Sequence, residues 1–191
     1  MRLLHRERPL TRDIAAVAGG LAVGVVSSRL LPPLLAGAAG SVRASLGENP
    51  FDRLMQDHRS VLSLLERLVG ASENSPARRM AVFLAVKRAL AKHALAEEDV
   101  VYPLLQTKAN AATAAKQLYS EHADMKVHLY ELEMAPAGAA WAERARSLQA
   151  LIARHIREEE DVQFPRLQAL LDGEGRRRLA GQVRREEALI L

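Results

Sequence analysis

Apolar residues recur at alternating steps of three and four positions in four successive segments, at residues 51–68, 83–100, 115–132 and 145–162. Because an α-helix turns once every 3.6 residues, this spacing places the apolar side chains of each segment on one face. Each segment is therefore predicted to be a helix with one buried face. Short connections make neighbouring helices antiparallel, so the pattern predicts an all-α, antiparallel up-down-up-down four-helix bundle.

Residues that favour the start or the end of a helix separate these segments. Asn49 and Ser75 are each followed by a proline, which predicts an N-cap and a first helical turn at both positions. Residues 133–138 contain a proline and a glycine and are predicted to join the third helix to the fourth. Pro103 and Pro165 are expected to kink or end the second and fourth helices.

The two ends of the chain differ from the predicted bundle, which we place at residues 49–172. Residues 1–48 are rich in alanine and glycine, and residues 14–42 carry a single charge. A membrane-spanning helix needs about 20 apolar residues, and one arginine and two prolines interrupt this run. A membrane-associated helix and an arm that packs on the bundle or on another subunit both stay open, whereas a signal peptide is disfavoured. Residues 173–191 are predicted to form a short charged helix.

Histidine and glutamate occupy positions of the apolar faces that leucine would fill in an ordinary bundle. The second and fourth segments each contain a histidine followed four residues later by a glutamate, and the thirteen-residue stretches that begin there share seven identical positions. A spacing of four puts both side chains on one helix face, one turn apart. The four segments together supply six such residues, His58, His93, Glu97, His122, His155 and Glu159. We expect all six to be buried together.

Burying four imidazoles and two carboxylates in a small bundle would be costly without partners, because each group loses several kcal/mol of hydration. Metal ions would provide such partners. Each half of the chain offers two histidines and one glutamate. If Glu97 and Glu159 both bridge, each of two ions receives two imidazoles and two carboxylate oxygens. A solvent-derived bridge would add a fifth ligand and leave one position open for an exogenous ligand.

The composition restricts both the metals that the site could bind and the classes of partner. The chain has no cysteine, which excludes an iron–sulfur cluster, a cysteine-bound zinc site and a disulfide framework. Imidazole with bridging carboxylate favours iron, with manganese and zinc as competitors, whereas calcium and magnesium prefer oxygen ligands. We therefore predict two non-heme iron ions. The net charge of +4 is spread along the chain and aromatic residues are few, so we expect no nucleic-acid partner.

Other polar and aromatic residues lie next to the predicted ligands. Glu98, Asp99, Glu160 and Asp161 have two interpretations, a solvated acidic face or hydrogen-bond partners of the ligands, and neither makes them ligands. Tyr119 could line the site, although packing in the core is the favoured role for its ring. None of these residues is included in the predicted ligand set.

The order of the ligands resembles that of hemerythrin-like proteins of the HHE cation-binding domain family. The family pattern is a lone histidine, a His-x-x-x-Glu pair, a second lone histidine and a second pair, with an aromatic residue and a proline after each pair. Residues from about 51 to 171 match it, with Tyr102 and Phe164 as the aromatic residues. Oxygen-carrying hemerythrins have a further histidine where this chain has Lys126, and an aspartate in place of Glu159. The resemblance therefore implies a more symmetric site than theirs.

An open coordination position beside a histidine-rich ligand set favours a protein that binds dioxygen or nitric oxide, for sensing or for protection against oxidative or nitrosative stress. Two alternatives stay open: a di-iron enzyme that reduces nitric oxide or decomposes peroxide, and a protein that stores or delivers iron. The expected partner is thus a small diatomic ligand or peroxide. A cytoplasmic location is favoured, with membrane association through residues 14–42 still open and the oligomeric state undetermined.

Overall fold

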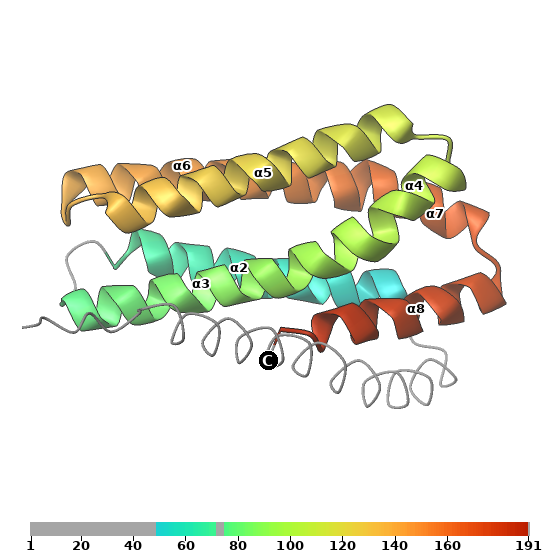
Figure 1. Ribbon diagram of the computed structural model, residues 1–191, viewed down its shortest axis with the longest axis horizontal. Coiled ribbons are helices and arrows are strands. Elements are labelled where there is room, and N and C mark those ends of the chain that lie inside the picture. Colours follow the sequence, from blue (N-terminus) through green and yellow to red (C-terminus); the bar gives the residue numbers. More distant parts are fainter. Residues whose placement is uncertain (1–48, 72–74, 191) are drawn as a thin grey trace, which may run out of the picture.

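The described part of the computed structural model, residues 49–71 and 75–190, consists of helices joined by short turns and contains no strand (Figure 1). The elements in chain order are α2 (Pro50–Val69), α3 (Pro76–Ala96), η1 (Glu97–Val101), α4 (Tyr102–Thr107), α5 (Ala112–Met134), α6 (Ala139–Glu158), η2 (Glu159–Gln163), α7 (Phe164–Leu170) and α8 (Gly173–Glu187). The prediction of an all-helical fold is confirmed. Because η1 and η2 continue the helices on either side of them, the described residues form five continuous helical rods.

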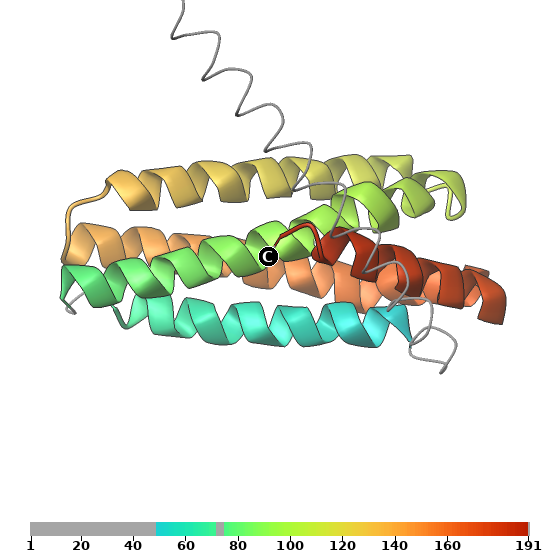
Figure 2. The same cartoon turned by 60° about the horizontal axis from the view of Figure 1, so that its bottom comes forward.

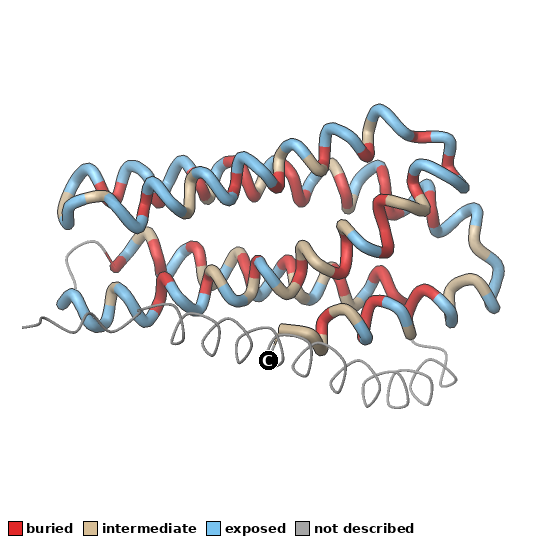
Figure 3. The backbone as a smooth tube through the Cα atoms, viewed as in Figure 1, coloured by how far each residue is buried: buried red, intermediate tan, exposed pale blue. Residues whose placement is uncertain are grey.

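The first four rods lie side by side, and α8 lies against α3 (Figures 1 and 2). Helix α2 packs against α3 and α6, while α5 packs against α6 and α4. Figure 1 shows that each of these four rods runs in the direction opposite to the one before it. Buried residues recur along the faces that the rods turn toward one another (Figure 3).

Two apolar clusters fill the interior. The first includes Leu65 and Trp141, near the turns that follow α2 and α5. The second includes Leu105 and Leu167, in α4 and α7, near the other end of the rods. On α2, His58 lies between residues of the two clusters, and the other predicted ligands occupy the same level of their own helices. The candidate site is therefore a polar layer enclosed by apolar packing on both sides.

The ends of the helices follow the sequence only in part. The side-chain oxygen of Asn49 accepts a hydrogen bond from the backbone N–H of Phe51 at 3.2 Å, so this residue caps α2 as predicted. Ser75 is also the N-cap residue, of α3, with a proline in the first turn as predicted, although its side chain makes no capping hydrogen bond. Gly138, in the turn between α5 and α6, has a φ of 96°, a left-handed conformation that a side chain would strain.

The two prolines that follow the His-x-x-x-Glu pairs do not end their helices. Each helix passes instead through a π-helical turn, in which the backbone N–H of Tyr102 or Phe164 donates to the carbonyl five residues earlier. The wider turn accommodates the next residue, a proline, which has no N–H to donate and whose ring would clash with the carbonyl four residues before it. One residue is thereby added to the turn, so the buried face shifts by one position.

This shift explains one wrong expectation about the core. A regular spacing places Val162 on the buried face, but Val162 is 47% exposed and the adjacent Gln163 is buried in its place. In the equivalent turn of the first half, Val100 and Val101 are both buried. The two halves of the chain therefore share the π-helical turn but fill it with different side chains.

Helix α8 lies alongside α3 and η1, next to the second apolar cluster. It begins after Asp172, whose Oδ1 accepts a hydrogen bond from the backbone N–H of Gly175 at 2.6 Å. Leu179 and Val183 are buried in the second cluster, and Glu187 forms an ion pair with Arg53 of α2. The C-terminal helix thus covers one face of the bundle, with its apolar side inward.

Residues 1–48 lie outside the described residues, and so do the expectations placed on them, the apolar helical extension and the membrane association of residues 14–42. Within residues 49–71 and 75–190, no helix has the length and apolar character that crossing a membrane requires.

Candidate metal centre

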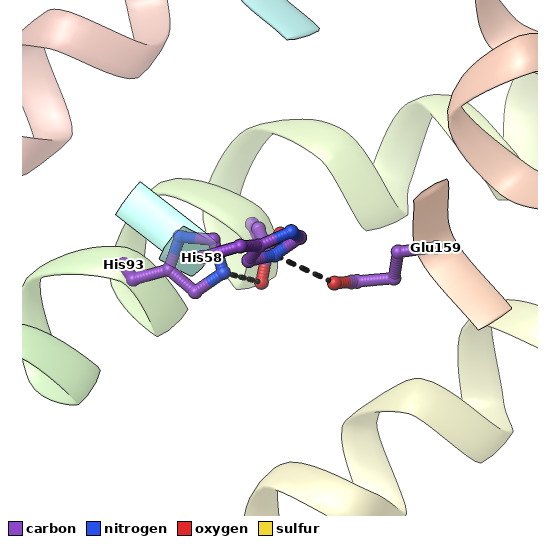
Figure 4. A group of neighbouring side chains, drawn as sticks. His58, His93 and Glu159 are labelled. Carbon is purple, nitrogen blue, oxygen red and sulfur yellow. Dashed lines mark ion pairs between the residues drawn. The ribbon is translucent and has the colours of Figure 1, made fainter. Parts of the chain in front are cut away.

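The six residues singled out from the sequence meet in the middle of the bundle. They come from four rods: His58 from α2, His93 and Glu97 from the junction of α3 with η1, His122 from α5, and His155 and Glu159 from the junction of α6 with η2. Each is at most 5% exposed. Figure 4 shows three of these side chains, from α2, α3 and η2, directed toward a common point.

The carboxylate of Glu97 lies among three imidazoles. Its Oε2 is 3.1 Å from His93 Nε2 and 3.5 Å from His122 Nε2. Its Oε1 is 3.7 Å from His58 Nε2. One glutamate therefore reaches histidines from both halves of the chain, which is the placement that a bridging carboxylate requires.

The carboxylate of Glu159 is placed in the same way. Its Oε2 is 3.2 Å from His58 Nε2 and 3.4 Å from His155 Nε2, so it also reaches both halves of the chain. The potential ligand atoms form two groups, each with all atoms within 4.8 Å of one another. These groups are His58, His93, Glu97 and Glu159, and Glu97, His122 and His155. The arrangement offers two adjacent positions for a cation.

A glutamate holds the outer nitrogen of three of the four imidazoles. Nδ1 of His58 is 2.7 Å from Glu160 Oε1, Nδ1 of His122 is 2.9 Å from Glu98 Oε1, and Nδ1 of His155 is 2.7 Å from Glu121 Oε2. A proton on Nδ1 donated to the carboxylate leaves the lone pair of Nε2 directed at the centre. Carboxylates commonly orient metal-binding histidines in this way and increase their basicity.

The fourth imidazole breaks the symmetry of the site. His93 is the counterpart of His155, and Asp57 is the counterpart of Glu121, but Nδ1 of His93 has no hydrogen-bond partner among the described residues. Asp57 is one methylene shorter than a glutamate, and its carboxylate pairs with Lys92 at 3.3 Å. One of the two cation positions is therefore lined by a less firmly oriented histidine.

Tyr102 places a hydroxyl in the middle of the six residues. Its Oη donates to Glu159 Oε1 at 2.7 Å and is 3.0 Å from His122 Nε2 and 3.3 Å from Glu97 Oε2. In an uninterrupted α-helix Tyr102 would lie about 140° around the axis from Glu97. The π-helical turn η1 brings the two side chains to the same side of the helix.

The equivalent residue in the second half has no hydroxyl. Phe164 follows η2, and its ring stacks on that of His58, with the centroids 5.7 Å apart and the planes inclined by 6°. The tyrosine and the phenylalanine therefore give the two sides of the site different chemistry. Within the described part of the chain, only the Tyr102 side places a hydroxyl proton among the potential ligand atoms.

Four polar atoms at the centre have no hydrogen-bond partner among the described residues: His58 Nε2, His93 Nε2, Glu97 Oε1 and Glu159 Oε2. A buried polar atom left in this state costs about 1–3 kcal/mol. All four belong to the group of possible ligands that contains both glutamates. Imidazole nitrogen and carboxylate oxygen are the donors that divalent transition metals bind, so the residues fit a pair of such ions.

Several groups of the site have pKa values shifted toward their charged forms. Burial lowers the pKa of His58, but the carboxylates of Glu159 and Glu97, 3.2 and 3.7 Å from its Nε2, outweigh this effect and raise the pKa to about 10. For His122 burial also acts downward, and Glu97 and Glu98 raise the pKa to about 9. Burial raises the pKa of Glu97, but the surrounding histidines hold it well below its usual range. Since an imidazole must lose its proton to bind a metal, cation binding here would release protons.

Several functional residues were only partly foreseen. Glu98 and Glu160 form hydrogen bonds with predicted ligand histidines, which is the second of the two interpretations given for the acidic residues. Asp99 and Asp161 are exposed and match the first, a solvated acidic face. The hydrogen bond between Glu121 and His155 is not among the predictions, although the position of Glu121 directly before His122 was a usable signal.

Tyr102 belongs to the repeated sequence motif but not to the predicted site, because helical periodicity places it on another face of the helix. The hydroxyl of Tyr119 donates to the backbone carbonyl of Glu98, and its ring packs edge-on against that of Tyr102. Tyr119 therefore helps to position Tyr102 but is not itself among the potential ligands.

A cavity of about 320 Å³ opens on the histidine side of the centre. All four histidines line one end of it, and it continues along α3 and α5 past Leu90 and Met125, with Ile152 of α6 on another wall. The charged side chains of Lys87 and Glu133 line its other end. The centre is thus reached through a passage with mainly apolar walls.

Comparison with known proteins supports a cation-binding role. Residues 49–167 match the family described as "Hemerythrin HHE cation binding domain". A protein of Nostoc sp. (strain PCC 7120 / SAG 25.82 / UTEX 2576) named "DNA nickase" is 28% identical over 127 residues, which cover 66% of this chain and 35% of that protein. The chain thus spans about a third of the length of this relative. No solved structure matches the chain.

Proposed function

The chain belongs to the hemerythrin HHE cation-binding domain family, and we propose that residues 49–172 form a hemerythrin-like up-down-up-down four-helix bundle that holds two iron ions. The proposed ligands are the six buried residues, His58, His93, Glu97, His122, His155 and Glu159. Glu97 and Glu159 would help to hold both ions, because each carboxylate reaches imidazoles of both halves. Bound iron would supply a site that binds small ligands and exchanges single electrons.

We propose that the protein binds dioxygen or nitric oxide for sensing or for protection against oxidative or nitrosative stress. The observation that carries this proposal is the cavity, because its apolar walls lead directly to all four histidines. Small apolar molecules occupy dry apolar cavities readily. Neither Glu97 nor Glu159 lines the cavity. An incoming ligand would therefore meet the imidazole side of the centre and leave the bridging side undisturbed.

Tyr102 favours a second candidate, an enzyme that reduces nitric oxide or decomposes peroxide. Burial and the charges of Glu97 and Glu159 raise the pKa of Tyr102 well above its usual value, so its hydroxyl keeps its proton. The Oη that carries this proton donates to Glu159 Oε1 at 2.7 Å and is 3.0 Å from Nε2 of His122, a residue that lines the cavity. The hydroxyl therefore lies directly behind the imidazole that an incoming ligand would meet. DNA cleavage is not part of either proposal, since most of the length of the nickase relative has no counterpart here.

The two candidates differ in what a ligand does after binding. We expect the anaerobically reduced, iron-loaded protein to give a stable change in its visible spectrum with nitric oxide or air that reverses when the gas is removed. Consumption of many molecules of nitric oxide or hydrogen peroxide by each chain would instead support the enzyme. A reduced, iron-loaded protein whose spectrum responds to neither gas nor peroxide would contradict both.

The asymmetry at His93 gives a separate prediction. Asp57→Glu adds the methylene that Glu121 has in the other half, so we expect the longer side chain to hydrogen-bond Nδ1 of His93. Loss of an orienting carboxylate commonly lowers metal affinity by about 10–100-fold, and gaining one should slow the release of metal to a chelator by a similar order. The measurement is the chelation time course, which we expect to be biphasic in the natural chain.

The matched control for this prediction is Asp52→Glu, an exposed residue in the first turn of the same helix. This change should leave both chelation phases as they are. An unchanged time course in Asp57→Glu would contradict the assignment of His93 as the less firmly held ligand.

A further inference from the structure

The cavity beside the centre is larger than a diatomic gas requires. Its volume of about 320 Å³ is roughly twice the ~150 Å³ of an apolar protein cavity that holds benzene. It also lies in the range of about 300–1,000 Å³ that is typical of small-molecule pockets. A well-packed core leaves few voids larger than a water molecule. The space between α3 and α5 is therefore large enough to bind a small molecule bigger than a diatomic gas.

The cavity is elongated along the helices. On α5 its lining extends from His122 to Glu133, eleven positions that correspond to a rise of about 16 Å. On α3 the lining extends from Lys87 to Ala94, a rise of about 10 Å. A molecule that fills such a space is long and narrow, so an unbranched chain fits better than a compact ring.

The side chains that line the cavity indicate an uncharged occupant. Beyond the histidines, the cavity is lined mainly by apolar side chains. The two lysines that line it already have acidic partners: Lys87 Nζ is 2.8 Å from Glu133 Oε2, and Lys126 Nζ is 3.2 Å from Glu98 Oε1. A charged ligand would have to displace one of these pairs. A neutral polar group can instead lie at the histidine end, next to the imidazoles.

We propose that this cavity binds an uncharged, unbranched aliphatic molecule with one polar end group, the chain lying between α3 and α5 and the polar end next to the histidines. This site goes beyond the binding of a gas or peroxide. Both proposals use the apolar walls of the cavity, but the aliphatic site also requires the length of the cavity and requires no reaction at the metal. Either proposal can therefore fail while the other stands.

The test is calorimetric titration of the full-length, metal-loaded protein with primary alcohols from butan-1-ol to decan-1-ol. One molecule is expected to bind per chain. Burying one methylene group contributes about 0.8 kcal/mol, so the affinity should rise about fourfold for each added carbon that enters the cavity. Absence of saturable binding, or an affinity that does not depend on chain length, would overturn the proposal.

Two variants and a control locate the site. Ala91→Phe adds a ring to the α3 wall, and Leu129→Trp adds one to the α5 wall. Each should weaken binding of decan-1-ol by at least about tenfold, since a ligand that loses two buried methylene groups loses that much. Ala85→Phe, at an exposed position of α3 outside the cavity, should bind as the natural chain does. Equal affinity in all three variants would place the alcohol elsewhere and refute the site.

Discussion

Glu97→Ala is expected to abolish the binding of metal and the stabilisation that metal confers. Glu97 contributes oxygen atoms to both groups of possible ligands, so its loss removes a donor from each cation position. Metal at 100 times its dissociation constant adds about 2.7 kcal/mol to the stability of a folded protein. For a domain of this size that corresponds to roughly 5–10 °C in Tm. The measurement is the thermal midpoint with metal and with chelator, together with metal content.

The difference between the two midpoints is what tests the metal. Removing one member of a buried charge pair costs about 3–5 kcal/mol whether or not a metal is present. A fall in the metal-free midpoint alone would therefore say nothing about cations. The control is Glu131→Ala, whose carboxylate forms an exposed ion pair with Arg144 at the surface. It should keep the full metal-dependent shift, and a shift retained in Glu97→Ala would contradict the ligand assignment.

Deleting Asp99 is expected to destabilise the protein by about 3 kcal/mol or more, the cost of a proline inside a regular α-helix. Asp99 is exposed and lies within η1, so its side chain contributes no packing. Its removal takes out the residue that the π-helical turn adds, so the turn becomes α-helical and Tyr102 stays on the same side of the helix as Glu97. Pro103 then meets the carbonyl four residues before it, the clash that the wider turn avoids. The measurement is the free energy of unfolding from a urea titration, which reports the cost of that clash.

The substitution Asp99→Ala separates the backbone from the side chain. It keeps the length of the turn and should change the unfolding free energy by less than about 0.5 kcal/mol, as is usual at surface positions. Equal stability of the deletion and the substitution would mean that the π-helical turn has no part in accommodating Pro103.

The helical fold followed from the sequence because one simple pattern governs it. Steps of three and four placed Leu54, Leu65 and Leu148 on buried faces, and all three are fully buried. The same pattern brought histidine and glutamate to those faces. Since helical periodicity needs only local geometry, it identified which side chains would meet without any knowledge of the turns between helices.

The pattern failed where a helix departs from 3.6 residues per turn. Nothing in the spacing of apolar residues reveals a π-helical turn, so Val162 was placed on the wrong face and Tyr102 was left out of the site. The proline after each aromatic residue was the available signal, but a proline equally predicts a kink or an end. The carboxylates that hold the imidazoles were also hard to assign, because Glu98 reaches across to His122 on another helix.

The most direct test of the central claim is the metal content of freshly purified protein, determined for iron, manganese and zinc on the same sample. Two iron ions per chain, lost in Glu97→Ala and kept in Glu131→Ala, is the predicted result. Zinc in both positions, or no metal at all in a folded chain, would contradict the di-iron centre.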